Sequence, residues 1–386
     1  MILIKNANIH TMANECYESG MILIENGKIK AIGNSVEHEN IENLEVIDAK
    51  GKFLMPGLID AHTHLGMFEG GMGFEGNDGN EAVDPVTPQL RAIDAMNPRD
   101  EFVKEALEAG VTTVATGPGS ANVIGGQFTI MKTYGNTIDD MIIKDNFAMK
   151  VAFGENPKRV YSGQKKSPST RMATAAVLRE QLMKAKEYVA KQDRANGDAD
   201  KMPAFDVKMD ALSRVIRKEI PLKAHAHRAD DILTALRIAK EFDVDITLEH
   251  CTEGHLVVED LKKGYQKGII TGPSLSSRSK IELRNLTFET PGILAKAGLK
   301  VAIMTDHPVI PEEYLMVCAA LAARAGMDEE EALKAVTINA AEIIGVSDRI
   351  GSIEVGKDAD IVMYSGHPFD LRSKVEMVMV DGKRVK

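Results

Sequence analysis

The central part of the sequence alternates between short apolar segments typical of β-strands and longer segments with the hydrophobic spacing of α-helices. Strand-like segments occur at 111–116, 147–153, 222–227, 245–251, 267–272 and 300–306, and helical segments such as 170–192 and 230–242 separate them. This alternation is typical of a parallel sheet with helices outside it. With LMPGLIDAHTH (54–64) as a first strand and one more in FTIMKTYG (128–135), about eight strands are expected. We therefore predict an α/β protein with a (β/α)₈ TIM barrel.

The two ends of the chain have a β character that the middle lacks. MILIKNANIH and GMILIENGKIKAIG near the N-terminus and KVEMVMVDGKRV near the C-terminus contain β-rich runs interrupted by Asn-Gly or Asp-Gly. Such dipeptides between apolar runs are typical of hairpin turns. We expect a small β-sandwich domain formed from residues 1–52 and 346–386, joined to a barrel domain over residues 53–345.

Composition sets limits on the function. Of 386 residues, 44% are hydrophobic and 27% charged, and the formal net charge is −10, which predicts a globular protein and argues against nucleic-acid binding. The three cysteines are widely spaced and support neither a disulfide framework nor a cysteine-based zinc site. The N-terminus does not resemble a secretory signal, and no apolar run approaches the roughly 20 residues that cross a bilayer. We expect a cytoplasmic protein without a membrane partner.

Histidines concentrate where the predicted strands end, which is where barrel enzymes carry their chemistry. Five of the ten histidines lie at such ends, and an aspartate ends the last strand; these residues are His62, His64, His225, His227, His250 and Asp306. Side chains alternate along a strand, so His62 and His64 share one face. Imidazole and carboxylate are the usual ligands of zinc and similar ions. The pattern predicts a site for one or two divalent ions, against the alternative of core or mouth histidines that bind no metal.

These motifs resemble those of the metal-dependent amidohydrolase superfamily. The similarity rests on PGLIDAHTHLG at the first strand, HAH at the fifth, EHC at the sixth, TDHP at the eighth and the tail INAAEIIGVSDRIGSIEVGKDADIVMY. It covers nearly the whole chain and is greatest to the imidazolonepropionase-like branch.

The resemblance implies roles for individual residues. The implied ligands are His62, His64, His225, His250 and Asp306. Members with two metals bridge them by a carboxylated lysine or a glutamate, and here we prefer Glu155 to Lys150, because strand alternation turns Lys150 away from the side of Glu155. His227 competes with His225 for one ligand position and otherwise contacts the substrate.

The implied reaction is hydrolysis of an amide or cyclic amide C–N bond by metal-activated hydroxide, with Asp306 as proton acceptor and donor. Zinc is the preferred ion, with manganese or iron as alternatives. Arg159, His227 and Arg278 are candidate contacts for a carboxylate-bearing substrate such as an N-acyl amino acid, a dipeptide or a cyclic ureide. The alternatives are a one-metal hydrolase of imidazolonepropionase or deaminase type and a non-catalytic scaffold. A homo-oligomer is expected.

Overall fold

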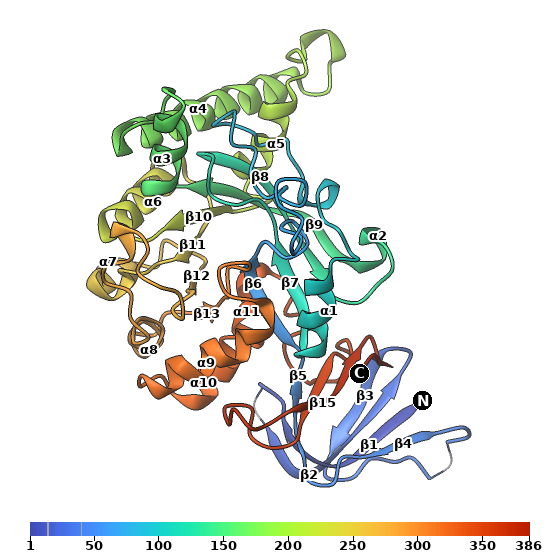
Figure 1. Cartoon of the computed structure of the whole chain (residues 1–386). Helices are drawn as coiled ribbons and strands as arrows, with labels where there is room; N and C mark the ends of the chain where they lie inside the picture. The colour runs from blue at the N-terminus through green and yellow to red at the C-terminus, as the bar shows by residue number, and fades with distance from the viewer. Residues whose placement is uncertain (14, 40) are drawn as a thin grey trace.

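The structure, a computed structural model, describes residues 1–13, 15–39 and 41–386. The described chain forms two eight-stranded sheets. One sheet curves into a nearly closed barrel, and the other forms a smaller unit that contains both ends of the chain (Figure 1).

The barrel-shaped sheet follows the order of the sequence, from β6 to β13. Its strands are β6 (Leu58–Thr63), β7 (Val111–Thr116), β8 (Ile124–Lys132), β9 (Ile142–Ala152), β10 (Leu222–Ala226), β11 (Ile246–His250), β12 (Gly268–Thr271) and β13 (Val301–Ile303). Neighbouring strands are parallel from β6 to β7 and from β9 to β13. Strand β8, however, is antiparallel to both of its neighbours, β7 and β9. The prediction of a purely parallel sheet is therefore wrong at this one strand.

The short connection between β7 and β8 explains the exception. Only residues 117–123 lie between these strands. A parallel neighbour needs a crossover of a dozen or more residues, usually through a helix, whereas an antiparallel neighbour can follow a short loop. The chain therefore reverses at this point.

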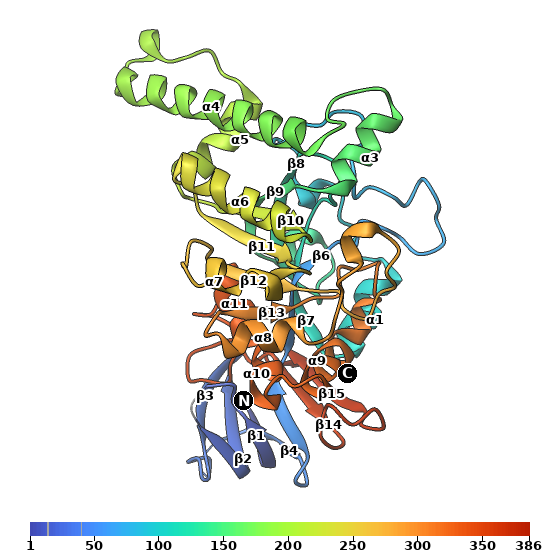
Figure 2. The same cartoon turned by 90° about the vertical axis from the view of Figure 1, so that its left-hand side faces the viewer.

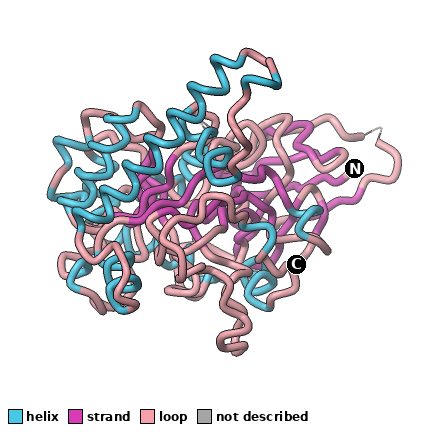
Figure 3. Tube along the Cα trace, turned by 90° about the horizontal axis from the view of Figure 1, so that it is seen from above, coloured by secondary structure: helices cyan, strands magenta, loops and turns pink. Residues whose placement is uncertain are grey.

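Helices cover the outer face of the barrel (Figure 2). They are α1 (Glu101–Glu108), α2 (Ile138–Met141), α3 (Glu155–Gly163), α4 (Arg171–Ala195), α5 (Val207–Ile216), α6 (Ala229–Phe242), α7 (Val258–Leu261), α8 (Thr290–Lys296), α9 (Leu315–Arg324), α10 (Glu329–Lys334) and α11 (Ile338–Ile344). The largest apolar cluster joins strands β9 to β11 to helices α4 to α6, through residues such as Val151, Leu182, Leu212 and Ile238. Seen from above, the strands run through the middle of the molecule and helices lie at its outside (Figure 3).

The smaller unit combines strands from both ends of the chain. Its strands are β1 (Ile2–His10), β2 (Cys16–Glu25), β3 (Lys28–Gly33), β4 (Glu45–Asp48), β5 (Phe53–Pro56), β14 (Ile361–Tyr364), β15 (Val375–Val380) and β16 (Lys383–Arg384). They form one hydrogen-bonded sheet in which β5 pairs with both β1 and β14. One apolar cluster contains Ile4 and Ile22 from the N-terminal part and Ile361 and Met377 from the C-terminal part, so each end buries the other.

Among the described residues, no helix has both the length and the apolar character that crossing a membrane requires.

Candidate metal centre

Two groups of potential ligands meet at the ends of the barrel strands. His62 and His64 on and just after β6 lie beside Asp306, which follows β13, and their ligand atoms lie within 4.8 Å of one another. Asp306 Oδ1 is 3.2 Å from His64 Nε2 and 3.6 Å from His62 Nε2. Residues more than 240 positions apart in sequence therefore form one potential metal site, which we call the first triad.

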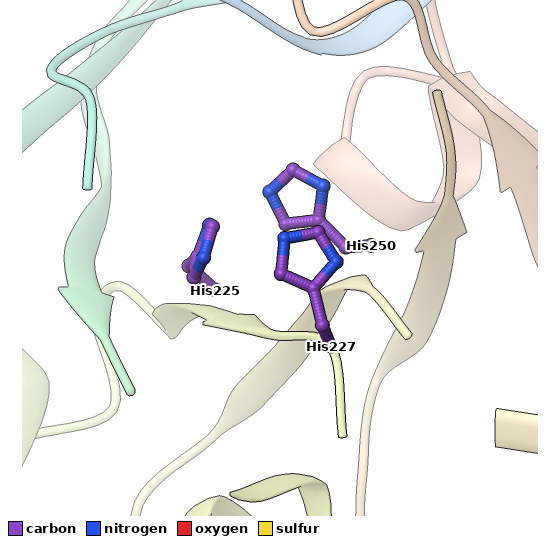
Figure 4. Close-up of side chains that lie close together, drawn as sticks. All are labelled: His225, His227 and His250. Carbon is purple, nitrogen blue, oxygen red and sulfur yellow. The ribbon is translucent and has the colours of Figure 1, made fainter. Parts of the chain in front are cut away.

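The second triad consists of His225 and His227 from β10 and its end and of His250 at the end of β11. The three rings face a common space (Figure 4), and the ring centre of His250 is 4.3 Å from those of both His225 and His227. The ring centres of His62 and His250 are 5.7 Å apart, so the two triads adjoin. The structure brings His225 and His227 together with His250, so the geometry does not separate the two candidates for this ligand position.

Hydrogen bonds fix which ring nitrogens are available. Nδ1 of His64 lies 2.6 Å from the Gly117 carbonyl oxygen, and Nδ1 of His250 lies 2.8 Å from the Gly272 carbonyl oxygen. A carbonyl only accepts, so Nδ1 carries the hydrogen in both rings and Nε2 keeps its lone pair for a ligand. Such carbonyl partners commonly orient metal-binding histidines.

His225 lacks the hydrogen bonds that a buried imidazole normally makes. Its side chain is 3% exposed, and neither ring nitrogen has a partner within the part of the chain that the structure describes. Buried polar atoms are almost always satisfied, and an exception needs an explanation. A metal ion bound by one of the nitrogens would supply the missing interaction, so this donor set fits a divalent ion.

Burial also keeps the imidazoles in the form that binds metals. Burial is the main reason that the pKa values of His62, His225 and His250 lie well below the usual histidine value. Burial also lowers the pKa of His227 to about 3. Neutral imidazole is the ligand form, because a protonated ring has no free lone pair.

The structure shows which face of β9 points into the barrel. Met149, Val151 and Phe153 pack into the apolar cluster beneath the helices, so the opposite face, which carries Lys150, points into the barrel. Lys150 Nζ lies 3.0 Å from His62 Nε2.

Glu155, by contrast, belongs to neither triad. The strand ends at Ala152, and Gly154, with a φ of 80°, turns the chain into α3 with Glu155 as its first residue. The backbone N–H of Glu155 donates to Glu282 Oε2 at 2.9 Å. Strand alternation could not predict this position, because the chain is no longer extended there.

A cavity of about 750 Å³ opens above the triads. Its lining includes His64, His225, His227 and Asp306, together with Arg159 from α3. Arg278 is absent from the described lining, and its guanidinium donates instead to the Leu286 carbonyl oxygen at 2.7 Å. Lys280, which the sequence analysis did not select, lines the cavity, and only the folded loop after β12 identifies it.

Comparisons with known proteins agree with this geometry. The sequence matches the Amidohydrolase family over residues 53–385. The crystal structure of an amidohydrolase from Thermotoga maritima MSB8 is 47% identical, with a TM-score of 0.96 and full coverage of both chains. An imidazolonepropionase from Bacillus cytotoxicus is 26% identical over 91% of this chain and 84% of its own length. Amidohydrolase tasK from Hapsidospora irregularis is 30% identical over 94% of this chain, which spans 39% of that relative's length.

The chain belongs to the amidohydrolase family. The resemblance deduced from the strand-end motifs is thereby confirmed, and the chain is a hydrolase that acts on carbon–nitrogen bonds. The family is metal-dependent, and the two triads are the candidate ligands of the ion.

Proposed function

We propose that this chain hydrolyses a linear or cyclic amide C–N bond in a small, carboxylate-bearing substrate, such as an N-acyl amino acid, a dipeptide or a cyclic ureide. The observation that carries the proposal is the meeting of both triads at one cavity, which His64, His225, His227 and Asp306 all line. That cavity has the volume of an ordinary small-molecule site.

The two triads would hold one or two divalent ions, which we propose to be zinc because imidazole nitrogen and carboxylate oxygen suit it; manganese and iron are alternatives. When bound, such an ion polarises a carbonyl and brings the pKa of water close to neutrality. In this proposal His62, His64 and Asp306 hold one ion, and His225 and His250 contribute to the second.

Asp306 is the proposed proton carrier. Its Oδ1 lies 3.2 Å from His64 Nε2 and 3.6 Å from His62 Nε2, and the residue lines the cavity, so we propose that the other carboxylate oxygen accepts a proton from the attacking water. The same oxygen then delivers that proton to the leaving nitrogen. His227 and Arg159 line the cavity and are the proposed substrate contacts.

For a two-ion site, Lys150 is the better placed bridging group. It contacts His62, its charge acts on the pKa of His225 and His250, and Glu155 lies in neither triad. We propose that Lys150, once converted by carbon dioxide to a carbamate, would supply the carboxylate ligand that a two-ion site needs.

A one-metal enzyme of imidazolonepropionase or deaminase type is the second candidate. The position of Glu155 outside both triads favours it if Lys150 stays an unmodified amine, because no carboxylate then links the two sites. About two bound ions per chain would support the two-ion proposal, and one ion would support the alternative.

Hydrolysis of a substrate panel by zinc- and manganese-loaded protein tests the proposal. The panel contains N-acyl amino acids, dipeptides and cyclic ureides. Asp306→Asn should lower kcat about 10²–10⁴-fold, because the proton acceptor is lost. Metal content is measured in both proteins, so that loss of the ion is distinguished from loss of proton transfer.

Asp200→Asn is the control, because Asp200 is exposed in the connection between α4 and α5. It should leave kcat unchanged. Equal kcat in the Asp306→Asn variant and the wild type would refute the role of Asp306, and no hydrolysis of any panel member by metal-loaded wild type would refute the proposed function.

A further inference from the structure

A series of polar contacts along the wall of the cavity joins two loops and the first turn of α3. Asn156 Nδ2 donates to Ser120 Oγ at 2.8 Å, and Lys280 Nζ donates to Asn156 Oδ1 at 2.9 Å. Ser120 follows β7, Asn156 is the second residue of α3, and Lys280 follows β12. All three line the cavity, so the contacts fix a set of donors on its surface.

The buried carboxylate of Glu282 contacts two of the segments that carry these residues. Glu282 is 1% exposed, and its Oε2 accepts the backbone N–H of Glu155. A Cβ atom at Gly154 would lie 2.7 Å from that oxygen, so the glycine makes room for the carboxylate. Oε1 of Glu282 has no hydrogen-bond partner among the described residues and lies 3.7 Å from Lys280 Nζ. The ammonium group is thus held between Glu282 and Asn156.

The contacts leave donors directed to the cavity. An ammonium group has three hydrogens, and Asn156 accepts one of those on Lys280, whereas Glu282 Oε1 at 3.7 Å is an ion-pair partner beyond hydrogen-bond distance. Ser120 Oγ accepts from Asn156, so its own O–H remains able to donate. The Ser120 hydroxyl and the remaining N–H groups of Lys280, both in the cavity lining and joined through Asn156, are therefore available to an anion.

The charge of the cavity also favours an anion. Arg159 lies three residues after Asn156 on α3, a spacing that puts both on one face of the helix, and both line the cavity. Within the described lining, Asp306 is the only carboxylate, and it belongs to the first triad. The outer part of the cavity is thus cationic in a protein whose net charge is −10.

We propose that Lys280, Ser120 and Arg159 form a subsite for a free carboxylate of the substrate, and that Asn156 and Glu282 are positioning residues for Lys280. This inference rests on the proposed function and narrows it: N-acyl amino acids and dipeptides with a free carboxylate are substrates, and their carboxamides are poor ones. Glu282 behind the ammonium reduces the net positive charge, which suits a monoanion better than a dianion such as phosphate.

The test compares Lys280→Met with wild type in the metal-loaded enzyme, on pairs of substrates that differ only in carboxylate or carboxamide. A hydrogen bond to a charged group is lost, so kcat/KM for the carboxylate should fall about 10–100-fold, mainly through KM. The carboxamide should change less than about 3-fold, because it does not use the cation. Lys280→Arg, which keeps the charge, should restore part of the loss.

Two further variants distinguish loss of carboxylate binding from a change in overall charge or structure. Lys158→Met removes a cation from α3 that does not line the cavity, and it should not change the preference for the carboxylate. Glu282→Gln should raise KM for the carboxylate by a larger factor than KM for the carboxamide, because Lys280 loses a positioning partner. A purely structural role of Glu282 would instead lower kcat for both substrates.

Binding by the Asp306→Asn protein tests the subsite without turnover. Calorimetry with N-acetyl amino acids and their carboxamides should show tighter binding of the carboxylates, and Lys280→Met should abolish the difference. Equal effects of Lys280→Met on both members of each pair, in kinetics and binding, would overturn the subsite. Catalytic failure of metal-loaded wild type on the whole panel would overturn the proposed function, whereas the binding measurement would still decide the subsite.

Discussion

Two of the proposed ligands have an uncommon backbone conformation. His250 and Asp306, each at the end of a barrel strand, have φ values of 68° and 55°. Left-handed conformations of residues other than glycine cost of order 1–3 kcal/mol and tend to occur at functional sites. Leu248, two residues before His250, packs into the apolar cluster beneath the helices, so regular alternation would direct His250 outward. The left-handed turn lets its ring join the second triad, which offers a physical reason for the strain.

In the two-ion proposal, Lys150 is the residue that decides the number of bound metal ions. Burial is the largest cause that lowers the pKa of its ammonium group to about 7, so a fraction is neutral near pH 7 and can react with carbon dioxide. We predict that Lys150→Gln reduces bound metal from about two ions to one or none per chain, measured by elemental analysis. Labelled bicarbonate should give a carbamate signal in the wild type by NMR, and this signal should be missing in the variant.

Glu155→Gln is the matched comparison for Lys150→Gln, because Glu155 was the alternative bridging group and lies in neither triad. It should retain the metal content and the carbamate signal of the wild type. The opposite result, with metal lost from Glu155→Gln and retained by Lys150→Gln, would reinstate the interpretation that the sequence favoured.

At the scale of elements, an ion pair in the interior of the barrel links three strands. Lys223 on β10 and Glu249 on β11 are 1% and 0% exposed, and Lys223 Nζ lies 2.8 Å from Glu249 Oε2. Lys223 also donates to the Ala61 carbonyl oxygen on β6 at 2.9 Å, and His62 Nδ1 lies 2.8 Å from Glu249 Oε2. Barrel interiors are usually filled by branched apolar side chains. Here a buried carboxylate, Glu249, lies next to His62, a proposed ligand of the first triad.

Replacement of Lys223 should therefore destabilise the barrel strongly. Lys223→Met leaves the buried Glu249 carboxylate without its cation, and we predict a loss of about 3–5 kcal/mol in the free energy of unfolding, measured by urea titration. Lys218→Met is the control, because Lys218 forms an exposed pair with Asp243, and exposed pairs contribute little to stability. If both variants unfold at the same urea concentration, the interior pair does not stabilise the barrel.

At the scale of the whole molecule, one lysine joins the barrel to the smaller sheet. Lys132 at the end of β8 is 4% exposed, and its Nζ contacts Asp358 at 2.9 Å, Asp360 at 3.1 Å and also Asp381. The three aspartates belong to the C-terminal segment that contributes β14 to β16. At the contact between the two sheets, a buried cation therefore offsets two buried carboxylates, Asp358 and Asp360, and a half-exposed one, Asp381.

The stability of this junction should depend on pH. Burial raises the pKa of Asp360 from its usual 3.8 to about 6, so between these values the folded chain holds a proton that the unfolded chain has released. The contribution of this group to stability therefore falls as the pH rises through about 6. In Lys132→Met the buried carboxylates lose their cation, which protonation at low pH partly compensates.

We predict that Lys132→Met lowers the thermal unfolding midpoint by clearly more at about pH 8 than at about pH 5. Calorimetry at both values measures the difference, and Lys263→Met, which removes an exposed lysine paired with Asp260, is the control. A loss of stability in Lys132→Met that is the same at both pH values would show that ionised carboxylates are not what Lys132 offsets.

The sequence by itself determined most of the architecture and the kind of chemistry. Strand–helix alternation predicted the barrel-shaped sheet, β-rich ends predicted the second sheet, and histidines at strand ends predicted the residue types that meet at the cavity. These features are local: periodicity and strand ends are properties of short segments. The antiparallel direction of β8 could also have been predicted from the sequence, because the connection before this strand is short.

Only the tertiary structure decided which side chains share a space. Alternation gives the relative faces of a strand but not which face meets the helices, and only the fold shows that Lys150 lies on the inner face of β9, 3.0 Å from His62. Two further contacts likewise depend on how segments after different strands pack: His227 with His250, and Lys280 with Glu282. The physical reason is that distances between remote segments follow from the packing of the whole barrel, whereas the spacing of residues within one segment follows from its backbone alone.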